Sequence, residues 1–187
     1  MGVLSRTCFV LLAAAFAASG GVRPALAQEP LERDVKAAFL FNFTKFVDWP
    51  AGTPAGNEPF RLCLVSDPAF QRSVEQTIAG ETVNGRPLQS LAPRTVEEAR
   101  KCQMLFVSRG EMGTAASRLL AAVRDLPVLT VSDRAQFARD GGGIELVRDD
   151  NRIRFDINVP GAERGGIKLS SRLLRVARHL HESPKKH

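Results

Sequence analysis

The stretch Leu62-Cys-Leu-Val-Ser-Asp-Pro68 joins an apolar run to a helix-start signal, and it decides the fold class. A near-continuous apolar run of this length is typical of a strand that is buried on both faces of a parallel sheet. Asp67 can cap a helix, and Pro68 suits the first helical position. Two later runs, Met104–Ser108 and Val128–Ser132, have the same character. The repeated order of strand and helix predicts right-handed parallel crossovers.

The two later runs also end in helix-start signals. Ser108-Arg-Gly-Glu111 has the residues of a capping box, and Ser132 and Asp133 are both cap candidates. Asp67, Ser108, Ser132 and Asp133 all fall at the carboxyl ends of predicted parallel strands, where open α/β sheets bind ligands. These four residues are therefore also the candidate lining of a small-molecule crevice.

The C-terminal third of the chain follows a different strand pattern. Apolar and polar residues alternate over Ile153–Val159, and a polar turn, Asp149-Asp-Asn151, separates this segment from Ile144–Leu146. A period of two is typical of a strand with one solvated face, so an antiparallel hairpin is predicted at the C-terminal edge of the sheet. Earlier in the chain, Asn84–Leu88 combines a turn dipeptide with a proline, and it is expected to precede or begin an edge strand.

A last helix is predicted to start after Ser170 or Ser171, either of which can cap it. Arg175 belongs to its basic side, which is expected to face solvent or, alternatively, an acidic partner. Its apolar residues are expected to dock on the sheet: Leu173, Leu174, Val176, Ala177 and Leu180. The patterns together predict an α/β fold, a single three-layer domain over residues 28–183 with a mainly parallel twisted sheet flanked by helices.

The segment Lys36–Pro50 contains the only tryptophan of the chain and four of its eleven phenylalanines. At about 100° per residue, Phe41 and Lys45 fall on a polar side of the predicted helix, which ends near Trp49 because a proline follows. An exposed aromatic residue is typical of a contact with a partner or a second copy, although Phe41 could instead pack inside the protein. Phe41, Lys45, Trp49 and Arg175 are therefore candidate partner-binding residues. The side expected to face the core consists of Leu31, Val35, Phe39, Leu40, Phe43, Phe46 and Val47.

Residues 1–27 have the three parts of a secretory signal. Arg6 supplies a positive start, an apolar core follows, and Ala25-Leu-Ala27 is the type of site at which a signal peptidase cuts. The apolar run is too short to span a bilayer, so the mature chain is expected to begin at Gln28 and to be periplasmic, not embedded in the membrane. Residues 184–187 are expected to form a frayed tail.

The charge pattern argues against a nucleic-acid partner. The net charge of +6 falls to +4 without Arg6 and Arg23, and the basic residues are scattered apart from Lys185-Lys186 near the end of the chain. Proteins that bind nucleic acids usually concentrate their basic residues in a patch or a stripe.

Two cysteines, Cys63 and Cys102, lie outside the predicted signal peptide. In an oxidising compartment, a lone pair of cysteines in one small domain most often forms a disulfide. Such a bond would stabilise the fold by about 2–4 kcal/mol. The alternative is a redox-sensitive bond that controls partner binding.

The sequence contains no motif for catalysis. Neither Ser108 nor Ser132 lies in a G-x-S-x-G nucleophile elbow, and no histidine is near them in the sequence. His179 and His181 would point apart on a helix, and Gly141-Gly-Gly143 precedes a strand, which is the wrong order for a phosphate-binding loop. We therefore expect no enzyme, no cofactor and no metal site. A small-molecule-binding accessory module of a sensor kinase or transport system is the alternative, followed by a hydrolase.

Four groups of segments, spread over nearly the whole mature chain, carry a family resemblance. They are Lys36–Pro50; Gly85–Pro87 with Cys102–Ser108; Val128–Asp133 with Phe137-Ala138 and Gly141-Gly142; and Arg152–Asn158 with Ile167–Leu174. In this order, they resemble the YfiR family of periplasmic regulatory proteins.

The resemblance implies a non-enzymatic periplasmic protein that represses an inner-membrane diguanylate cyclase by binding its periplasmic sensor domain. Less cyclic di-GMP is then made, and biofilm formation falls. An outer-membrane lipoprotein as a second partner and a homodimer are also implied. Cys63 and Cys102 match one disulfide of the family, whereas the mature chain lacks the cysteines for a second one.

Overall fold

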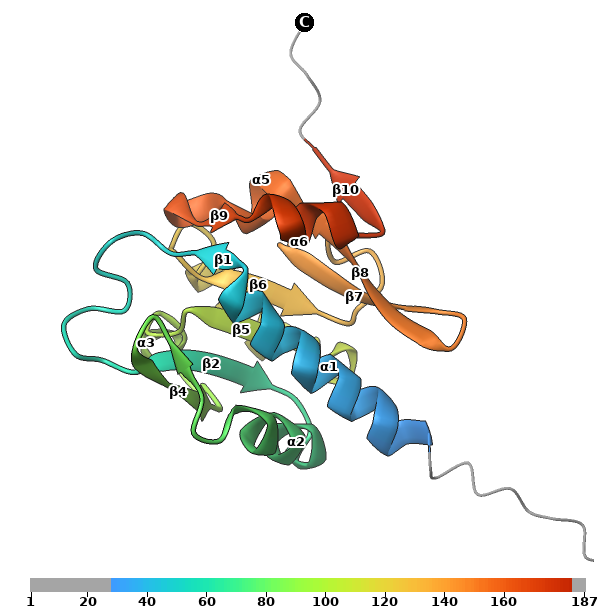
Figure 1. Cartoon of the computed structure of the whole chain (residues 1–187), viewed down its shortest axis with the longest axis horizontal. Coiled ribbons are helices and arrows are strands. Elements are labelled where there is room, and N and C mark those ends of the chain that lie inside the picture. Colours follow the sequence, from blue (N-terminus) through green and yellow to red (C-terminus); the bar gives the residue numbers. More distant parts are fainter. Residues whose placement is uncertain (1–27, 183–187) are drawn as a thin grey trace, which may run out of the picture.

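A computed structural model describes residues 28–182, so the predicted signal peptide (1–27) and tail (184–187) lie outside the described residues. In chain order the elements are α1 (Gln28–Lys45), β1 (Val47–Asp48), β2 (Phe60–Val65), α2 (Pro68–Ile78), β3 (Thr82–Val83), β4 (Arg86–Leu91), α3 (Val96–Ala99), β5 (Met104–Val107), η2 (Arg109–Glu111), α4 (Thr114–Ala122), β6 (Leu129–Ser132), β7 (Ile144–Asp149), β8 (Arg152–Asn158), α5 (Val159–Ala162), η3 (Arg164–Gly166), β9 (Lys168–Leu169), α6 (Ser171–Val176) and β10 (His179–His181). Figure 1 shows their arrangement.

The described residues form an eight-stranded sheet in the order β10-β8-β7-β6-β5-β2-β4-β3, together with a small β1-β9 pair. The five strands from β7 to β4 in this order are parallel, as the apolar runs predict. The chain moves from β2 outward to β4 and then crosses back to β5 on the other side of β2. The strand order therefore reverses between β2 and β5, and open α/β sheets place ligands beside such a point.

The predicted antiparallel hairpin is formed by β7 and β8. It is not the outermost element, because β10 pairs with β8 in parallel along the next position of the sheet. At the opposite edge, β3 and β4 meet through the turn at Asn84-Gly85, where both residues have positive φ angles of 51° and 76°. Positive φ at both central residues of a two-residue hairpin loop is the reason that Asn-Gly is favoured there.

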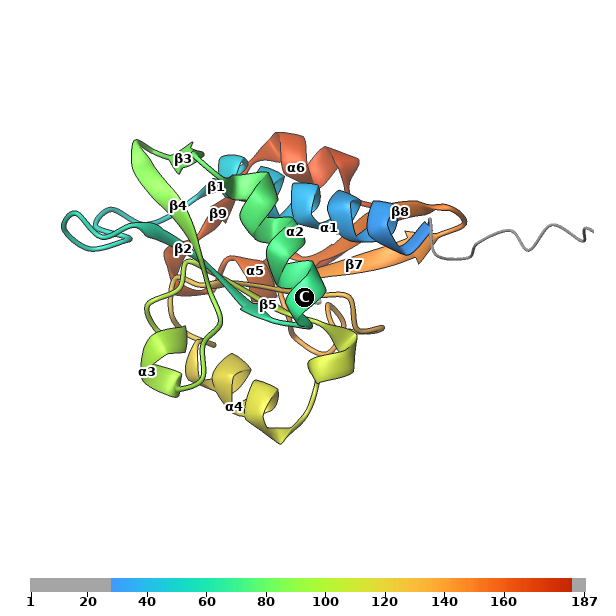
Figure 2. The same ribbon diagram turned by 90° about the horizontal axis from the view of Figure 1, so that it is seen from below.

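Helices cover both faces of the sheet, which confirms the three-layer architecture. In Figure 2, α1, α2 and α6 lie above the sheet, and α3 and α4 lie below it. The upper core is rich in phenylalanine, including Phe43, Phe70, Phe106 and Phe155. The lower core is built from smaller residues and contains the bonded pair Cys63–Cys102, whose Cα atoms are 5.8 Å apart.

The helix-start signals have different outcomes. Asp67 caps α2 as predicted, since its Oδ1 accepts from the backbone N–H groups of Ala69 and Phe70. Ser108 makes no capping bond, and only the short 3-10 helix η2 follows it. Ser132 and Asp133 are followed by turns in place of a helix. Their side chains are used across the sheet, because Ser132 donates to the carbonyl of Val107 and Asp133 accepts from Arg109 N–H.

The last helix is shorter than predicted. Ser170 caps α6 by accepting from Leu173 N–H, but the helix ends at Val176 because Ala177 is extended, with φ −64° and ψ 144°. The chain then enters β10, where Leu180 is 42% exposed, and Val176 is 63% exposed. The prediction that Val176 and Leu180 dock on the sheet is therefore wrong, since pairing of β10 with β8 replaces the last helical turn.

Candidate functional site

Helix α1 packs on the sheet by a face that differs from the predicted one. Ala37, Leu40 and Phe43 are buried, whereas Val35 and Phe46 are each 36% exposed. The buried face is thus turned by about a third of a turn from the predicted stripe, at 100° per residue. The prediction is wrong for Val35, which lies away from the side of α1 that meets the strands. It is also wrong for Phe46, because α1 ends at Lys45 and not near Trp49, and Val47–Asp48 form β1.

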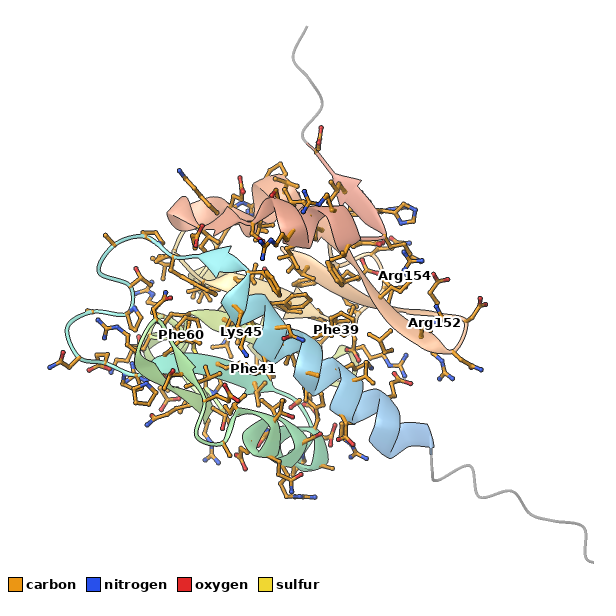
Figure 3. The ribbon with its side chains drawn as sticks, viewed as in Figure 1. Phe39, Phe41, Lys45, Phe60, Arg152 and Arg154 are labelled. Atoms are coloured by element: carbon orange, nitrogen blue, oxygen red, sulfur yellow. A yellow bond between two sulfur atoms is a disulfide. The ribbon has the colours of Figure 1, made fainter. Side chains whose placement is uncertain are left out.

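Phe39 and Phe41 flank the buried face of α1 on its two sides, and both are half-buried against the upper core. Figure 3 shows Phe39 on the side of α1 that faces β8 and Phe41 on the side that faces β2. Phe39 lies 5.6 Å from Phe155, measured between ring centroids, and Lys45 Nζ lies 3.8 Å from the centroid of Phe41. Of the two placements considered for Phe41, the structure shows packing, with a cation over its ring.

Trp49 and Arg175, the other candidate partner-binding residues, have contrasting environments. Trp49 is half-buried, its Nε1 donates to the carbonyl of Gln103 at 3.3 Å, and its ring meets Phe60 edge-on at 4.7 Å. It therefore anchors the connection between α1 and β2. Arg175 is exposed on α6. The four candidates do not form one cluster, since Lys45 contacts Phe41 while Trp49 contacts Phe60.

A sharper signal comes from large hydrophobic side chains that remain in contact with solvent. Among the described residues, those most exposed are Val35, Phe46, Val176 and Leu180. Val35 lies on α1 and Phe46 directly follows this helix, whereas Val176 lies on α6 and Leu180 on β10. Helices α1 and α6 lie on the same side of the sheet (Figure 2). We call these four residues the apolar face. Sequence reasoning missed it because it assigned every one of them to the core.

Hydrogen bonds hold the segments of the apolar face together. Ser170 N–H, at the start of α6, donates to the carbonyl of Phe46 at 3.0 Å. Past the end of α6, the guanidinium of Arg178 donates two bonds to Asp156 on β8, at 2.9 and 2.7 Å. The exposed positions of Phe46, Val176 and Leu180 are therefore set by paired backbone and a bidentate ion pair.

The ion pair at Asp156 alters the pKa values of both partners. Burial alone would raise the pKa of Asp156, but the hydrogen bonds from Arg178, together with the positive charge of that residue, outweigh burial and lower the pKa below its ordinary value. The same hydrogen bonds raise the pKa of Arg178. Asp156 therefore remains a carboxylate over a wide pH range and fixes β10 against β8.

A cavity of about 470 Å³ lies at the strand reversal between β2 and β5, and Asp67, Ser108 and Asp133 of the predicted crevice line it. That it binds a small molecule stays a prediction. Ser132 does not line it, because this residue is buried below and donates to Val107. Three of the four predicted crevice residues are thus brought together.

Helix α1 crosses this crevice and places a cation in it. Lys36 Nζ lies 2.8 Å from Asp133 Oδ2 and 2.8 Å from Glu32 Oε1. The hydrogen bond from Lys36 is the main reason that the pKa of Glu32 is lowered, against the opposing effect of burial. Over the whole lining the charges balance, because the four carboxylates Glu32, Asp67, Glu111 and Asp133 face the four cations Lys36, Arg33, Arg109 and Arg148. Lys36, which sequence reasoning did not single out, therefore forms ion pairs with two of the carboxylates that line the crevice.

Within residues 28–182, no group of three or more His, Cys, Asp and Glu side chains is placed to hold a metal ion. In the same residues, no helix combines the length and the apolar character needed to cross a bilayer.

The described residues form a three-layer α/β fold that leaves the four side chains of the apolar face exposed. Residues 33–178 match the family model described as YfiR/HmsC-like, so the chain belongs to this family. The family resemblance of the sequence is thereby confirmed. Membership supports, at the level of the family, a periplasmic regulatory protein of diguanylate cyclase signalling that partners a membrane sensor.

Solved structures resemble the chain in fold. An ABC domain in complex with L-Trp from Streptococcus pneumonia is 12% identical, with a TM-score of 0.50 over 75% of this chain. A conserved domain protein from Vibrio cholerae O1 biovar eltor is 12% identical, with a TM-score of 0.53 over 79% of this chain. The chain spans 60% of the length of each of these two structures. A search of curated proteins gave no match.

Proposed function

We propose that this protein is a periplasmic repressor that binds the sensor domain of an inner-membrane diguanylate cyclase and holds it inactive, which lowers the level of cyclic di-GMP. Membership of the YfiR/HmsC-like family supports the regulatory class. We place the contact on the apolar face, because its residues are the large hydrophobic side chains that the described part of the chain leaves exposed.

Repression requires that the protein binds the inactive state of the sensor more tightly than the active state. A ligand with equal affinity for both states shifts no equilibrium. A shift of about 100-fold requires roughly 2.7 kcal/mol of preference, at about 1.4 kcal/mol per factor of ten. Burying a valine or leucine side chain supplies about 1.5–3 kcal/mol. Val176 and Leu180 could therefore supply this preference if only the inactive sensor covers them.

The candidate partner-binding residues have distinct parts in this proposal. Arg175 is exposed next to Val176 and suits a polar rim that pairs with an acidic residue of the sensor. Phe41 and Trp49 are half-buried, and the exposed Lys45 contacts the ring of Phe41, so we assign these three residues to the support of α1 and of its connection to β2. A second copy of the chain or an outer-membrane lipoprotein that covers the same face would compete with the sensor and relieve repression.

The direct test is to measure binding of the purified protein to the purified periplasmic domain of a diguanylate cyclase from the same organism. The double variant Val176→Ser/Leu180→Ser is expected to bind at least about tenfold more weakly, because two apolar contacts are lost. Ala115→Ser is the matched control, since Ala115 is exposed on α4 beneath the opposite face of the sheet.

In cells, the double variant is expected to raise cyclic di-GMP toward the level of a deletion strain, while Ala115→Ser leaves it unchanged. Equal binding by the wild type and the double variant would reject the apolar face as the contact. Absence of binding to every cyclase sensor domain of the organism would reject the proposed function itself.

A further inference from the structure

A groove lies on the α4 side of the sheet, away from the apolar face and from the crevice at the strand reversal. Its volume is about 630 Å³, within the range of about 300–1,000 Å³ that is usual for ligand pockets. The groove exists because no helix follows Ser132, although the sequence predicts one; residues 134–141 form turns there. Thr130 of β6 and the side of α4 therefore stay open to a ligand.

The base and walls of the groove are apolar and tightly defined. Leu120 of α4, Val128 and Phe137 contribute to them. Gly142 lies directly against Phe137, since a Cβ atom at this glycine would be only 2.2 Å from Cε1 of the ring. This close approach fixes the ring beside the Gly141–Gly143 run and explains why position 142 carries no side chain.

Three arginines and one acidic residue surround the groove: Arg124, Arg134, Arg164 and Asp140. Arg134 Nη2 pairs with Asp140 Oδ2 at 2.5 Å, and Arg164 Nη1 donates to the carbonyl of Gly141 at 3.3 Å. The Nε atom of Arg134 is buried, and it has no hydrogen-bond acceptor among the described residues. The groove therefore gathers more guanidinium charge than its own carboxylate neutralises.

The guanidinium groups also converge in space. A Cβ atom built on Gly141 would lie 3.9 Å from Nη2 of Arg124 and 3.9 Å from Nη2 of Arg164. The guanidinium groups of Arg124, in the turn after α4, and Arg164, in η3, thus approach the same point beside Gly141. Like charges that meet in this way repel each other unless an anion lies between them, and guanidinium groups bind phosphate and carboxylate oxygens in pairs.

We propose that this groove binds a small dianion, either a phosphate compound or a dicarboxylate, through Arg124, Arg134 and Arg164. Three positive groups and one carboxylate leave a surplus of two charges, which a dianion neutralises. The apolar wall formed by Leu120 and Phe137 would accommodate a short carbon chain. The inference is independent of the proposed repression, because the groove and the apolar face lie on opposite sides of the sheet.

The test is calorimetric titration of the full mature protein with two probes, inorganic phosphate and succinate, which separate the phosphate and dicarboxylate classes. Saturable binding of one or both probes is expected. Arg124→Gln should weaken that binding by at least about tenfold, since a hydrogen bond between charged groups is lost. Arg118→Gln, a change at an exposed arginine of the preceding helix α4 that does not line the groove, should leave it unchanged.

Thermal unfolding without probe would show that both variants fold. Failure of both probes to bind saturably would overturn the proposal. Equal weakening by Arg118→Gln and Arg124→Gln would also overturn it, because the attraction would then come from general positive charge. Neither outcome bears on the sensor-binding assay, which depends on Val176 and Leu180.

Discussion

The two faces of the sheet are stabilised in different ways. On the upper face, α1, α2 and α6 bury a continuous set of aromatic and aliphatic side chains, in which Phe39, Phe43 and Phe155 contact one another at centroid distances of 5.1–5.9 Å. On the lower face, the short helix α3 and helix α4 bury small residues such as Ala99 and Ala116, next to a disulfide.

The difference between the two faces shows which regions stabilise the fold and which surfaces we propose for binding. The upper face buries the larger set of apolar side chains, and it leaves Phe46 and Val176 exposed. The lower face buries less apolar surface, and a covalent bond supports it. It also leaves the arginine-lined groove beside α4 open. Each face thus combines a well-packed region with a surface that we propose for binding.

The largest expected effect comes from the aromatic cluster of the upper face. Phe43→Ala should lower the free energy of unfolding by about 3–5 kcal/mol, because it removes a fully buried ring and leaves a cavity between α1 and β8. Chemical denaturation followed by circular dichroism would measure this loss. Asn42→Ala, at the exposed neighbouring position, should change stability by less than about 0.5 kcal/mol. Similar losses in both variants would contradict the packing of α1.

The disulfide of the lower face provides the second comparison. It joins residues 39 positions apart, so Cys63→Ala/Cys102→Ala should cost about 2–4 kcal/mol, mainly because the unfolded chain gains freedom. The wild-type protein exported to the periplasm should show no free thiol in a colorimetric thiol assay without reductant. Two titratable thiols in the folded protein would show that the lower face does not depend on a covalent bond. A regulatory role of this bond stays a prediction.

The smallest effect concerns the ion pair that holds the edge of the apolar face. Asp156→Asn should cost about 2 kcal/mol at neutral pH, since charge-assisted hydrogen bonds to Arg178 are weakened. Because the folded-state pKa of Asp156 is lowered, its contribution is complete above the ordinary aspartate pKa and is lost as the pH falls through the folded value. The stability difference between wild type and variant should therefore narrow on acidification, as measured by denaturation at several pH values.

The control for this experiment is Asp149→Asn, which disrupts the more exposed Asp149–Arg154 pair on the same hairpin. Such surface pairs contribute about 0–1 kcal/mol, so little change is expected. A difference at Asp156 that is constant with pH would show that the carboxylate charge does not hold β10.

Local chemistry made several features predictable. The apolar runs that became β2, β5 and β6 are recognisable because buried parallel strands need hydrophobic side chains on both faces. Asp67 before Pro68 and Ser170 before α6 are caps whose bonds lie within a few residues. Asn84-Gly85 specifies a tight turn through its own backbone preferences. In each case, the interaction that decides the structure lies within a few residues of the signal.

Features that depend on distant partners were predicted less well. Ser132 and Asp133 suit helix caps, yet both bond to β5 and its following turn, which leaves the groove open. Lys36 enters the crevice only because α1 crosses the strand ends and meets Asp133, 97 residues later. Leu180 fits a helical stripe, but pairing of β10 with β8 places it in an exposed strand.

By itself, the sequence determined the class of fold, the alternation of helices with parallel strands, the cysteine pair and the family to which the chain belongs. The tertiary structure decided which side of α1 is buried, and therefore that Val35 meets solvent, and it ended α1 before Phe46, which is also exposed. It also decided where the arginines converge. The physical reason is that composition and local capping energies can be read residue by residue, whereas burial and charge balance depend on segments that only folding brings together.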